Sequence, residues 1–327
     1  MNKKNTLFSI LEKFKKSRIL CAGDLILDKF VYGRVSRISP EAPIQILDIN
    51  SENFILGGCG NVCRNISAFD GTVDLVSAIG EDNVAKKIKK LISLERKINP
   101  FLFNVKNHIT PTKTRFISGT QQLLRVDDEQ ALKITSALKN HILSTIRTKS
   151  KNSSVVIFSD YGKGLFKKSI LNTLIRDLNK KGKIVVIDPK SSDFSIYSGA
   201  TLITPNANEL RAAVNFDCST EQKIQKAALF VINKYKIKNV LITRSEKGMM
   251  LVSKKGIKKF HSRAREVFDV SGAGDTVAAT FALSLSTGAA YEESALLSNI
   301  AAGIVVGKLG TAVASLKEMK REIEEIK

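Results

Sequence analysis

A short segment near the C-terminal end combines two groups that phosphoryl transfer requires. Gly272, Ala273 and Gly274 precede Asp275, and an apolar helical pattern begins directly after them. Small residues leave backbone N–H groups open at a helix N-terminus, where the helix dipole favours a phosphate. Asp275 falls in the first turn, where a carboxylate can accept the proton of an attacking hydroxyl. The pattern predicts phosphoryl transfer, and its alternative is a glycine-rich loop that merely enters a buried helix.

Two upstream segments have residues suited to a hydroxyl-rich ligand. Asp24 and Asp28 follow the first expected strand, and ligands of open α/β sheets bind beyond such strand ends. Their carboxylates can accept hydrogen bonds from sugar hydroxyls, although a helix cap or a turn would use them equally well. Gly57 and Gly58 permit close approach of backbone to ligand, and Asn61 offers a donor and an acceptor. A plain turn explains that glycine cluster equally well.

Two later segments suit a nucleotide and its metal. Asn206 and Glu209 stand on one helical turn after a strand, where an amide and a carboxylate suit hydrated Mg²⁺, although Asn206 could simply cap the helix. Residues 243–248 could form a nucleotide-binding turn. The alternative is that Arg244 or Lys247 is an ordinary surface charge. The chain has no Walker pattern and no G-x-G-x-x-G after its first strand, which counts against a P-loop enzyme and a Rossmann dehydrogenase.

The pattern of elements predicts an α/β fold with a mostly parallel sheet covered on both faces, because apolar runs alternate with helical periods. Strands are expected at residues 18–23, 73–79, 154–159, 183–188, 200–204 and 239–243. Helices are expected at residues 60–68, 83–94, 167–179 and 221–234, and from about residues 206, 274, 292 and 315.

Two alternating patches break this rhythm and predict hairpins with one face in water. They pair residues 30–34 with 44–49 and residues 112–117 with 122–126, and we assign them to a small β-lid from about 28–50 and 110–127. No linker or repeat divides the rest, so residues 17–327 are expected to form one domain. Residues 1–16 read as an amphipathic helix or extension.

The composition is that of a soluble globular protein. The chain has 327 residues, of which 43% are hydrophobic and 25% charged. No apolar run approaches the roughly 20 residues that cross a bilayer, and the N-terminus lacks a signal-peptide core, so we expect a cytoplasmic protein without a membrane partner. The four cysteines match neither a zinc site nor a disulfide framework, and we expect them to be reduced.

The net charge of +21 raises the question of a nucleic-acid partner. The lysine pairs, however, are scattered over different expected elements, and the chain has no tryptophan and no aromatic-plus-basic stripe. We therefore expect a solvated lysine-rich surface and no nucleic acid. The alternative from a different class is a nucleic-acid-binding protein on a scaffold that has lost catalysis.

Together, these segments resemble those of the ribokinase-like (PfkB) carbohydrate kinases. The similarity rests on residues 269–276, on Gly57-Gly58 with Asn61, and on Asn206-x-x-Glu209, and it covers about residues 17–315. It implies a three-layer α/β sandwich with a central, mostly parallel sheet and a small inserted β-lid. It also implies ATP and Mg²⁺ and leaves a monovalent cation such as K⁺ open. The sequence does not settle the oligomeric state, but a β-lid with exposed edges often pairs with another lid, so we expect a homodimer joined through the lid.

A narrower similarity is to the kinases of D-glycero-β-D-manno-heptose 7-phosphate. It rests on residues 23–33, 36–43, 121–127, 160–164, 188–190, 243–246 and 307–311, of which 36–43 are the most specific. It implies ATP-dependent phosphorylation at O1 to heptose 1,7-bisphosphate, in ADP-heptose (lipopolysaccharide core) biosynthesis. A kinase of ribose, fructose or a hexose phosphate is the alternative within the fold.

The family assigns a role to each matching residue. Asp275 is the implied base, and the amides of Gly272, Ala273 and Gly274 form the anion hole. The remaining assignments are Asn206, Ala207, Asn208 and Glu209 by the ATP phosphates, with Glu209 and, through water, Asn206 on Mg²⁺; Thr243, Ser245, Gly248 and Asn299 around the nucleotide; Asp24, Asp28, Gly57, Gly58, Asn61 and Lys163 on the sugar; and Arg37, Arg115 and Arg125 on the 7-phosphate.

The chain departs from the family pattern in two respects. Cys59 and Gly60 stand where such enzymes usually have two alanines, which is expected to loosen the local packing. Many relatives also have a nucleotidyltransferase domain with an H-x-G-H motif, and none of His108, His141 and His261 forms one. Adenylyl transfer is therefore expected from another protein.

Overall fold

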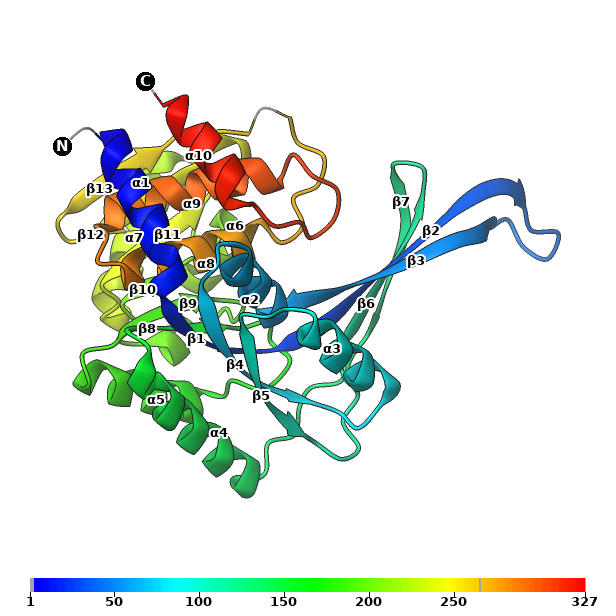
Figure 1. Ribbon diagram of the computed structural model, residues 1–327, viewed down its shortest axis with the longest axis horizontal. Helices are drawn as coiled ribbons and strands as arrows, with labels where there is room; N and C mark the ends of the chain where they lie inside the picture. Colours follow the sequence, from blue (N-terminus) through cyan, green and yellow to red (C-terminus); the bar gives the residue numbers. More distant parts are fainter. Residues whose placement is uncertain (1–2, 265, 327) are drawn as a thin grey trace.

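The body of the molecule is built on one nine-stranded sheet. The computed structural model describes residues 3–264 and 266–326. The strand order is β13-β12-β11-β10-β9-β8-β1-β4-β5, parallel from β11 to β5, with β12 and β13 added antiparallel at one edge (Figure 1). The strands are β1 (Arg18–Gly23), β4 (Thr72–Ile79), β5 (Ile98–Asn104), β8 (Val155–Ser159), β9 (Ile184–Asp188), β10 (Leu202–Ile203), β11 (Asn239–Thr243), β12 (Met249–Ser253) and β13 (Gly256–Phe260).

Helices cover both faces of this sheet, and successive strand residues contact opposite layers. In β1, Ile19 and Cys21 belong to one buried apolar cluster, whereas Leu20 and Ala22 belong to the other. The first layer contains α1 (Lys3–Lys13), α2 (Cys59–Ala68), α3 (Asn83–Ser93), α8 (Ala273–Ser286), α9 (Tyr291–Val305) and α10 (Leu316–Glu324). The second contains α4 (Ser136–Lys149), α5 (Lys168–Lys180), α6 (Ala207–Val214) and α7 (Glu221–Tyr235). The expected three-layer α/β sandwich is confirmed.

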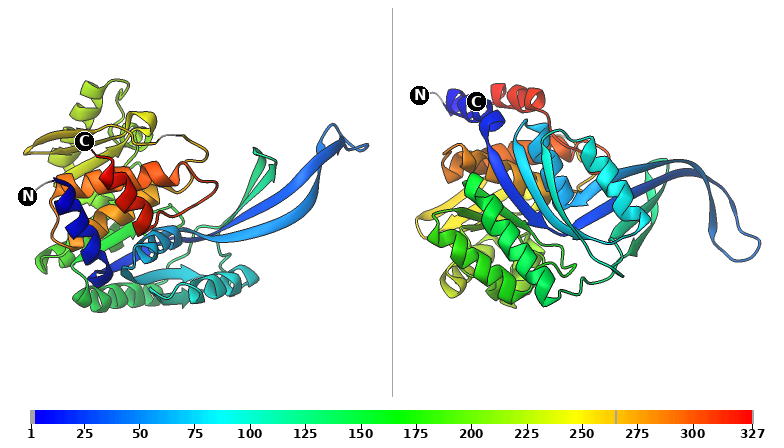
Figure 2. Two further views of the ribbon diagram at one scale, coloured as in Figure 1. Left: turned by 45° about the horizontal axis from the view of Figure 1, so that its top comes forward. Right: turned by 60° about the horizontal axis from the view of Figure 1, so that its bottom comes forward.

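A four-stranded antiparallel and parallel sheet projects from the body as the expected lid (Figure 2). Its order is β3-β2-β6-β7, with β2 (Leu25–Ile38), β3 (Gln45–Gly58), β6 (Thr112–Ser118) and β7 (Gln121–Asp128). The first hairpin is much longer than the predicted residues 28–50. Its strands continue into the body, where residues 25–28 and 56–58 are buried on both faces and therefore lose the alternating pattern.

The sequence pattern missed four elements and overestimated one. β5 contains Pro100 and lies at an edge of the sheet, where proline is tolerated, and α4 buries only Ile142, Leu143 and Ile146. The edge strands β12 and β13 were also not predicted, and the expected strand at residues 200–204 has only two residues in β10. At the N-terminus, α1 lies beside α10 (Figure 1).

The parallel register brings the carboxyl ends of five strands to one edge of the sheet. Gly23 of β1 pairs with Ser159 of β8, which pairs with Asp188 of β9. Beyond β10, Asn206 forms an isolated bridge with Thr243 of β11. The polar segments that follow these strands therefore lie next to one another, as ligand sites of open α/β sheets require.

Candidate active site

The N-terminus of α8 lies at this edge and begins with a glycine that no other residue could replace without strain. Gly272 has φ +79°, and a Cβ there would lie 2.5 Å from Nδ2 of Asn61. The backbone N–H of Thr276 donates to the Gly272 carbonyl, and its hydroxyl donates to Oδ1 of Asn65 (2.8 Å). These contacts fix the first turn of α8 against α2, so Asp275 has a defined position.

Two donors from distant segments hold the Asp275 carboxylate, which is only 3% exposed. Nδ2 of Asn61, on α2, donates to Oδ2 at 2.8 Å. The Tyr161 hydroxyl, in the loop after β8, donates to Oδ1 at 2.8 Å. Asn61, predicted to face the sugar, is fully buried and points its amide at Asp275. Tyr161 was not singled out, because nothing in its local sequence indicates which carboxylate it meets.

Burial makes Asp275 far more basic than an ordinary aspartate. Removal from water raises its pKa to about 7, and the hydrogen bonds from Asn61 and Tyr161 limit the rise. A carboxyl with this pKa is half-ionised near neutral pH, which suits a general base that must accept a hydroxyl proton and release it again.

Backbone N–H groups surround the same turn. The N–H of Ala273 donates to the Val270 carbonyl, whereas those of Gly272, Gly274 and Asp275 make no hydrogen bond within the described residues. Unpaired donors at the accessible start of a helix whose body is buried can bind an anion. The predicted anion hole thus has free donors at Gly272 and Gly274 but not at Ala273.

A cavity of about 140 Å³ opens beside Asp275. Oδ1 of Asp28 accepts from Arg115 at 2.6 Å in its wall, and a side chain at Gly57 would collide with Asp28, since a Cβ there would lie 2.2 Å from Oδ2. Oγ1 of Thr311 is buried without a hydrogen-bond partner in the described chain. The lining residues are Ile26, Asp28, Gly58, Lys113, Arg115, Tyr161, Ser271, Gly272, Asp275 and Thr311.

Asp24 lies next to this cavity but holds a loop. Its carboxylate accepts the backbone N–H groups of Tyr161 and Lys163 at 3.0 Å and of Leu165 at 3.3 Å. Burial raises the pKa of Asp24 to about 6, against the lowering effect of these hydrogen bonds. Asp24 therefore positions the loop that carries Tyr161.

Of the other predicted sugar and phosphate ligands, Arg125 and Arg37 lie on the lid and Lys163 lies in the loop after β8. Lys163 pairs with Glu129 at 2.5 Å, and Arg125 pairs with Asp127 at 2.9 Å. Arg37 is exposed near the outer end of β2. Lys163, Arg125 and Arg37 are not among the described residues that line the cavity beside Asp275.

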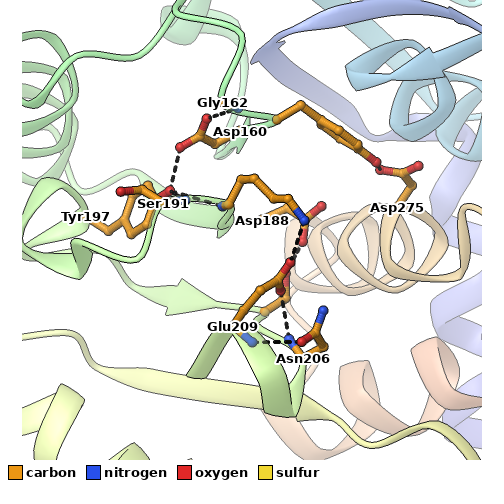
Figure 3. A network of polar contacts seen from close by, with 11 residues as sticks. Asp160, Gly162, Asp188, Ser191, Tyr197, Asn206, Glu209 and Asp275 are labelled. Carbon is orange, nitrogen blue, oxygen red and sulfur yellow. Dashed lines mark hydrogen bonds and ion pairs between the residues drawn. The ribbon is translucent and has the colours of Figure 1, made fainter. Parts of the chain in front are cut away.

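A second group of carboxylates faces Asp275 from β9 and α6 (Figure 3). Asp188 accepts from the Thr204 hydroxyl at 3.1 Å, and Oε1 of Glu209 lies 3.4 Å from Nζ of Lys190. Burial and then the negative charges of Asp275 and Glu209 raise the pKa of Asp188 well above its usual value. Asp188 is a further candidate site residue, which the sequence indicated only as part of the segment 188–190.

The chemistry of these donors fits a hydrated magnesium ion. Like-charged carboxylates at Asp188 and Glu209 would be stabilised by a divalent cation, and Mg²⁺ usually keeps several waters. No cluster of three or more His, Cys, Asp or Glu side chains able to hold a metal directly exists within residues 3–264 and 266–326.

The cysteines at positions 21, 59, 63 and 218 are free and buried.

Asn206 and Glu209 also cap α6. The Asn206 side chain accepts from the Glu209 N–H at 2.9 Å, and Oε2 of Glu209 accepts from the Asn206 N–H at 3.0 Å. The capping interpretation of Asn206 is therefore correct, and Oε1 of Glu209 still faces Lys190. Tyr197 and Asp160 brace the adjacent loops through a buried hydrogen bond of 2.5 Å (Figure 3).

A larger cavity, of about 400 Å³, lies on the other side of the α8 N-terminus. Gly248, in its wall, has φ +75°, and a Cβ there would lie 2.0 Å from the Phe260 carbonyl oxygen. Seven predicted residues line it, namely Asn206, Thr243, Ser245, Gly248, Ala273, Gly274 and Asn299. Ala207 and Asn208 are not among its described lining residues. Val267, Val270, Val277 and Val306 give it an apolar side suited to a flat nucleobase.

Two residues near this cavity, Asn299 and Arg244, make structural contacts that the sequence did not predict. The Asn299 amide donates to the His261 carbonyl at 2.7 Å, so it also fixes the segment after β13. Arg244, considered as an ordinary surface charge, is only 8% exposed and pairs with Glu221 at 2.5 Å.

Comparison with known proteins identifies the family to which this arrangement belongs. Residues 17–318 match the pfkB family carbohydrate kinase. The chain belongs to this family. It is 44% identical over 315 residues to the bifunctional protein HldE of Paramagnetospirillum magneticum, and 42% identical over 308 residues to that of Acidiphilium cryptum. The matches cover 96% and 94% of this chain but 64% and 63% of those relatives, so the chain spans less than two thirds of their length.

Solved structures with the same fold include two kinases of this kind. Phosphofructokinase-2 from Escherichia coli, in complex with substrates and products, has a TM-score of 0.81 at 19% identity, covering 94% of this chain and 98% of that one. Arabidopsis thaliana ribokinase, complexed with ribose and ATP, has a TM-score of 0.77 at 20% identity, covering 95% and 99%. The expected family, fold and enzyme class, a carbohydrate kinase, are confirmed. No helix of the described pfkB chain is long and apolar enough to span a membrane.

Replacing Gly272 by alanine tests how tightly the α8 turn is fixed. We expect Gly272→Ala to lower the free energy of unfolding by more than about 2 kcal/mol, because a left-handed backbone costs about 1–2 kcal/mol and the methyl group meets Asn61. The matched control is Gly182→Ala, which has φ +66° but no atom within 4 Å of the new Cβ. Urea unfolding of both variants measures the difference, and equal losses would contradict the contact with Asn61.

Proposed function

We propose that the chain transfers the γ-phosphoryl group of ATP to O1 of D-glycero-β-D-manno-heptose 7-phosphate. The product would be heptose 1,7-bisphosphate, for the biosynthesis of ADP-heptose and the lipopolysaccharide core. The observation that carries the proposal is the buried Asp275 carboxylate between two cavities, one of nucleotide size and one lined by Lys113 and Arg115. A base next to cations suits an acceptor that is itself phosphorylated.

The acceptor's identity rests on relatives and on sequence segments. Proteins named HldE are 39–44% identical to this chain over 94–98% of its length. Seven sequence segments indicate the heptose-phosphate branch, and residues 36–43 are the most specific of them. The proposal is limited to the kinase reaction.

The proposed mechanism is an in-line transfer in which Asp275 removes the proton from O1. Free N–H groups at Gly272 and Gly274 stabilise the charge of the γ-phosphoryl group, and the α8 dipole adds to them. Asp188 and Glu209, with Asn206 through water, would hold Mg²⁺, which supplies positive charge to the ATP phosphates when bound. The lid excludes water from the acceptor.

Asp275 is expected to set the pH dependence of the kinase. The base works only when ionised, so kcat/KM for the acceptor should fall as pH drops below about 7 and level off above it. Asp275→Asn should lower kcat by about 10²–10⁴-fold while leaving ATP binding intact. Coupled measurement of ADP release between pH 5.5 and 9, with calorimetry for ATP, checks both.

The control for this substitution is Asp217→Asn, which removes an exposed carboxylate paired with Lys223. It should leave the profile and kcat unchanged. An acid limb near pH 4, or normal turnover of Asp275→Asn, would show that another group is the base.

An acceptor panel tests the proposed substrate. Heptose 7-phosphate should give a higher kcat/KM than unphosphorylated heptose, fructose 6-phosphate and ribose, the last two chosen because structurally similar enzymes were solved with fructose 6-phosphate or ribose. Phosphorus NMR of the product should place the new phosphate on C1. A preference for ribose or fructose 6-phosphate would replace the heptose assignment by another sugar kinase.

We further propose that the lid joins two copies of the chain. Its outer strands β3 and β7 are sheet edges, and it carries exposed apolar side chains at Ile38, Ile44, Ile49, Leu124 and Val126. A tetrameric form of phosphofructokinase-2 from Escherichia coli is among the structures that share the fold.

Sedimentation velocity tests this pairing. The chain is expected to sediment as a dimer and Leu124→Glu as a monomer, because a carboxylate would be buried in the apolar contact. Leu94→Glu, at an apolar residue that is 71% exposed outside the lid, is the control and should stay dimeric. A monomeric parent chain would refute the proposal.

A further inference from the structure

One face of the lid carries a row of charges at the mouth of the acceptor cavity. Lys113 on β6 is in register with Asp28 on β2 and with Asp127 on β7, and Arg115 is in register with Arg125. Residues paired across neighbouring strands point to the same face of a sheet. The five side chains therefore share one face, and Lys113, Arg115 and Asp28 line the cavity together with Asp275.

Every cation of this group except Lys113 has an acidic partner. Arg115 pairs with Asp28, Arg125 with Asp127, and Lys163, from the loop after β8, with Glu129. Lys113 makes no ion pair within the part of the chain that the structure describes, and its ammonium group lies 5.9 Å from the centre of the Tyr161 ring. Of these four cations, Lys113 is thus the one that pairs with no carboxylate of the described residues, although its charge acts on Asp275 in the same cavity and lowers the pKa of that group.

The surroundings of Lys113 disfavour its charge in the absence of an anion. Half-burial lowers its pKa, as do the charges of Lys163 and Arg125, while Asp127 and Glu129 oppose the shift. A structural lysine in such a place would normally have a carboxylate partner. A phosphate would restore the balance, because it brings negative charge and several acceptor oxygens to a desolvated ammonium.

The three arginines predicted for the acceptor phosphate are less suited to it. Arg115 is already bound to Asp28. Arg125 is half exposed and bound to Asp127, and Arg37 is exposed near the outer end of β2 in the lid. Among the described residues that line the cavity, Lys113 is the cation without an ion pair.

We propose that Lys113 binds the phosphate group that the acceptor already carries and thereby selects a phosphorylated sugar. The inference rests on the proposed kinase reaction and deepens it. Lys113 enters the cavity from the lid, whereas Asp275 enters it from α8 in the body. The phosphate end and the reacting hydroxyl of the sugar are therefore held by different parts of the molecule.

The experiment compares phosphorylated and unphosphorylated acceptors in Lys113 variants. Lys113→Met removes the charge and keeps most of the side-chain length, and Lys113→Arg keeps the charge. For heptose 7-phosphate, Lys113→Met should lower kcat/KM by about 10- to 100-fold, chiefly through KM, as expected for one lost charged hydrogen bond. For unphosphorylated heptose the loss in kcat/KM should be much smaller, because only the effect of the Lys113 charge on the pKa of Asp275 is then lost, and Lys113→Arg should recover part of the loss for heptose 7-phosphate.

Lys29→Met is the matched control. Lys29 lies on the same lid, next to Asp28 in the chain and therefore on the opposite face, where it pairs with Glu52 at 2.7 Å. It should leave the ratio between the two acceptors unchanged. Thermal unfolding and ATP binding show that each variant is folded.

The outcomes separate this role from others. Equal losses for both acceptors, mainly in kcat, would show that Lys113 acts on the transferred phosphoryl group, and an unchanged ratio would show that it does not bind the acceptor phosphate; either result overturns the proposal. If the parent chain does not use heptose 7-phosphate, the proposed function fails by itself. The ratio is then measured with fructose 6-phosphate and fructose, and the same two results decide.

A second measurement uses inorganic phosphate as the probe. Phosphate should inhibit the phosphorylation of heptose 7-phosphate competitively with respect to that acceptor in the parent chain, and at least about tenfold more weakly in Lys113→Met. Equal inhibition of both would place the phosphate elsewhere and contradict the proposal.

Discussion

The burial of one carboxylate governs the construction of this site. An ionised carboxylate taken out of water is costly unless hydrogen bonds replace its hydration. Asp275 receives these bonds from Asn61 and Tyr161, which are 214 and 114 residues away along the chain. The two donors limit the rise in its pKa to about 7, so the group remains usable as a base. Burial thus supplies the basicity of Asp275, and the two hydrogen bonds keep its pKa near neutral pH.

These contacts depend on a second carboxylate. Asp24 holds the loop of Tyr161 by accepting three backbone N–H groups, so the hydroxyl of Tyr161 reaches Asp275 only while that loop keeps its shape. The loop and the start of α8 are also where glycine is required, at Gly162, Gly164 and Gly272. Asn61 and Asp24, which the sequence pattern suggested as sugar ligands, therefore hold Asp275 and the loop of Tyr161 in place in this structure.

The sequence was sufficient for features that depend on local order. Polar residues after strands, the glycine-rich start of α8 and the alternation of layers could all be predicted, since parallel strand ends meet at one edge. Contacts between side chains that are distant in the sequence could not be predicted. The contact of Asn61 with Asp275 and the approach of Asp188 to Asp275 depend on packing between segments about 90 to 210 residues apart, and so does the absence of an acidic partner for Lys113 among the described residues. The length of β2 and β3 was missed because burial on both faces removes the alternation.

Strand alternation in β6 places charged side chains on one face of the lid and an apolar side chain on the other. On β6, Lys113 and Arg115 face the acceptor cavity, whereas Phe116, in register with Leu124 of β7, faces the other way. A shift of one residue between β2 and β6 would exchange these faces, placing Phe116 toward the cavity and removing its cations. The parallel pairing of β2 with β6, unbroken from Leu27 to Gly33, therefore does more than support the lid. It fixes which charges line the cavity beside Asp275, and therefore which acceptor charge the proposed kinase reaction would favour.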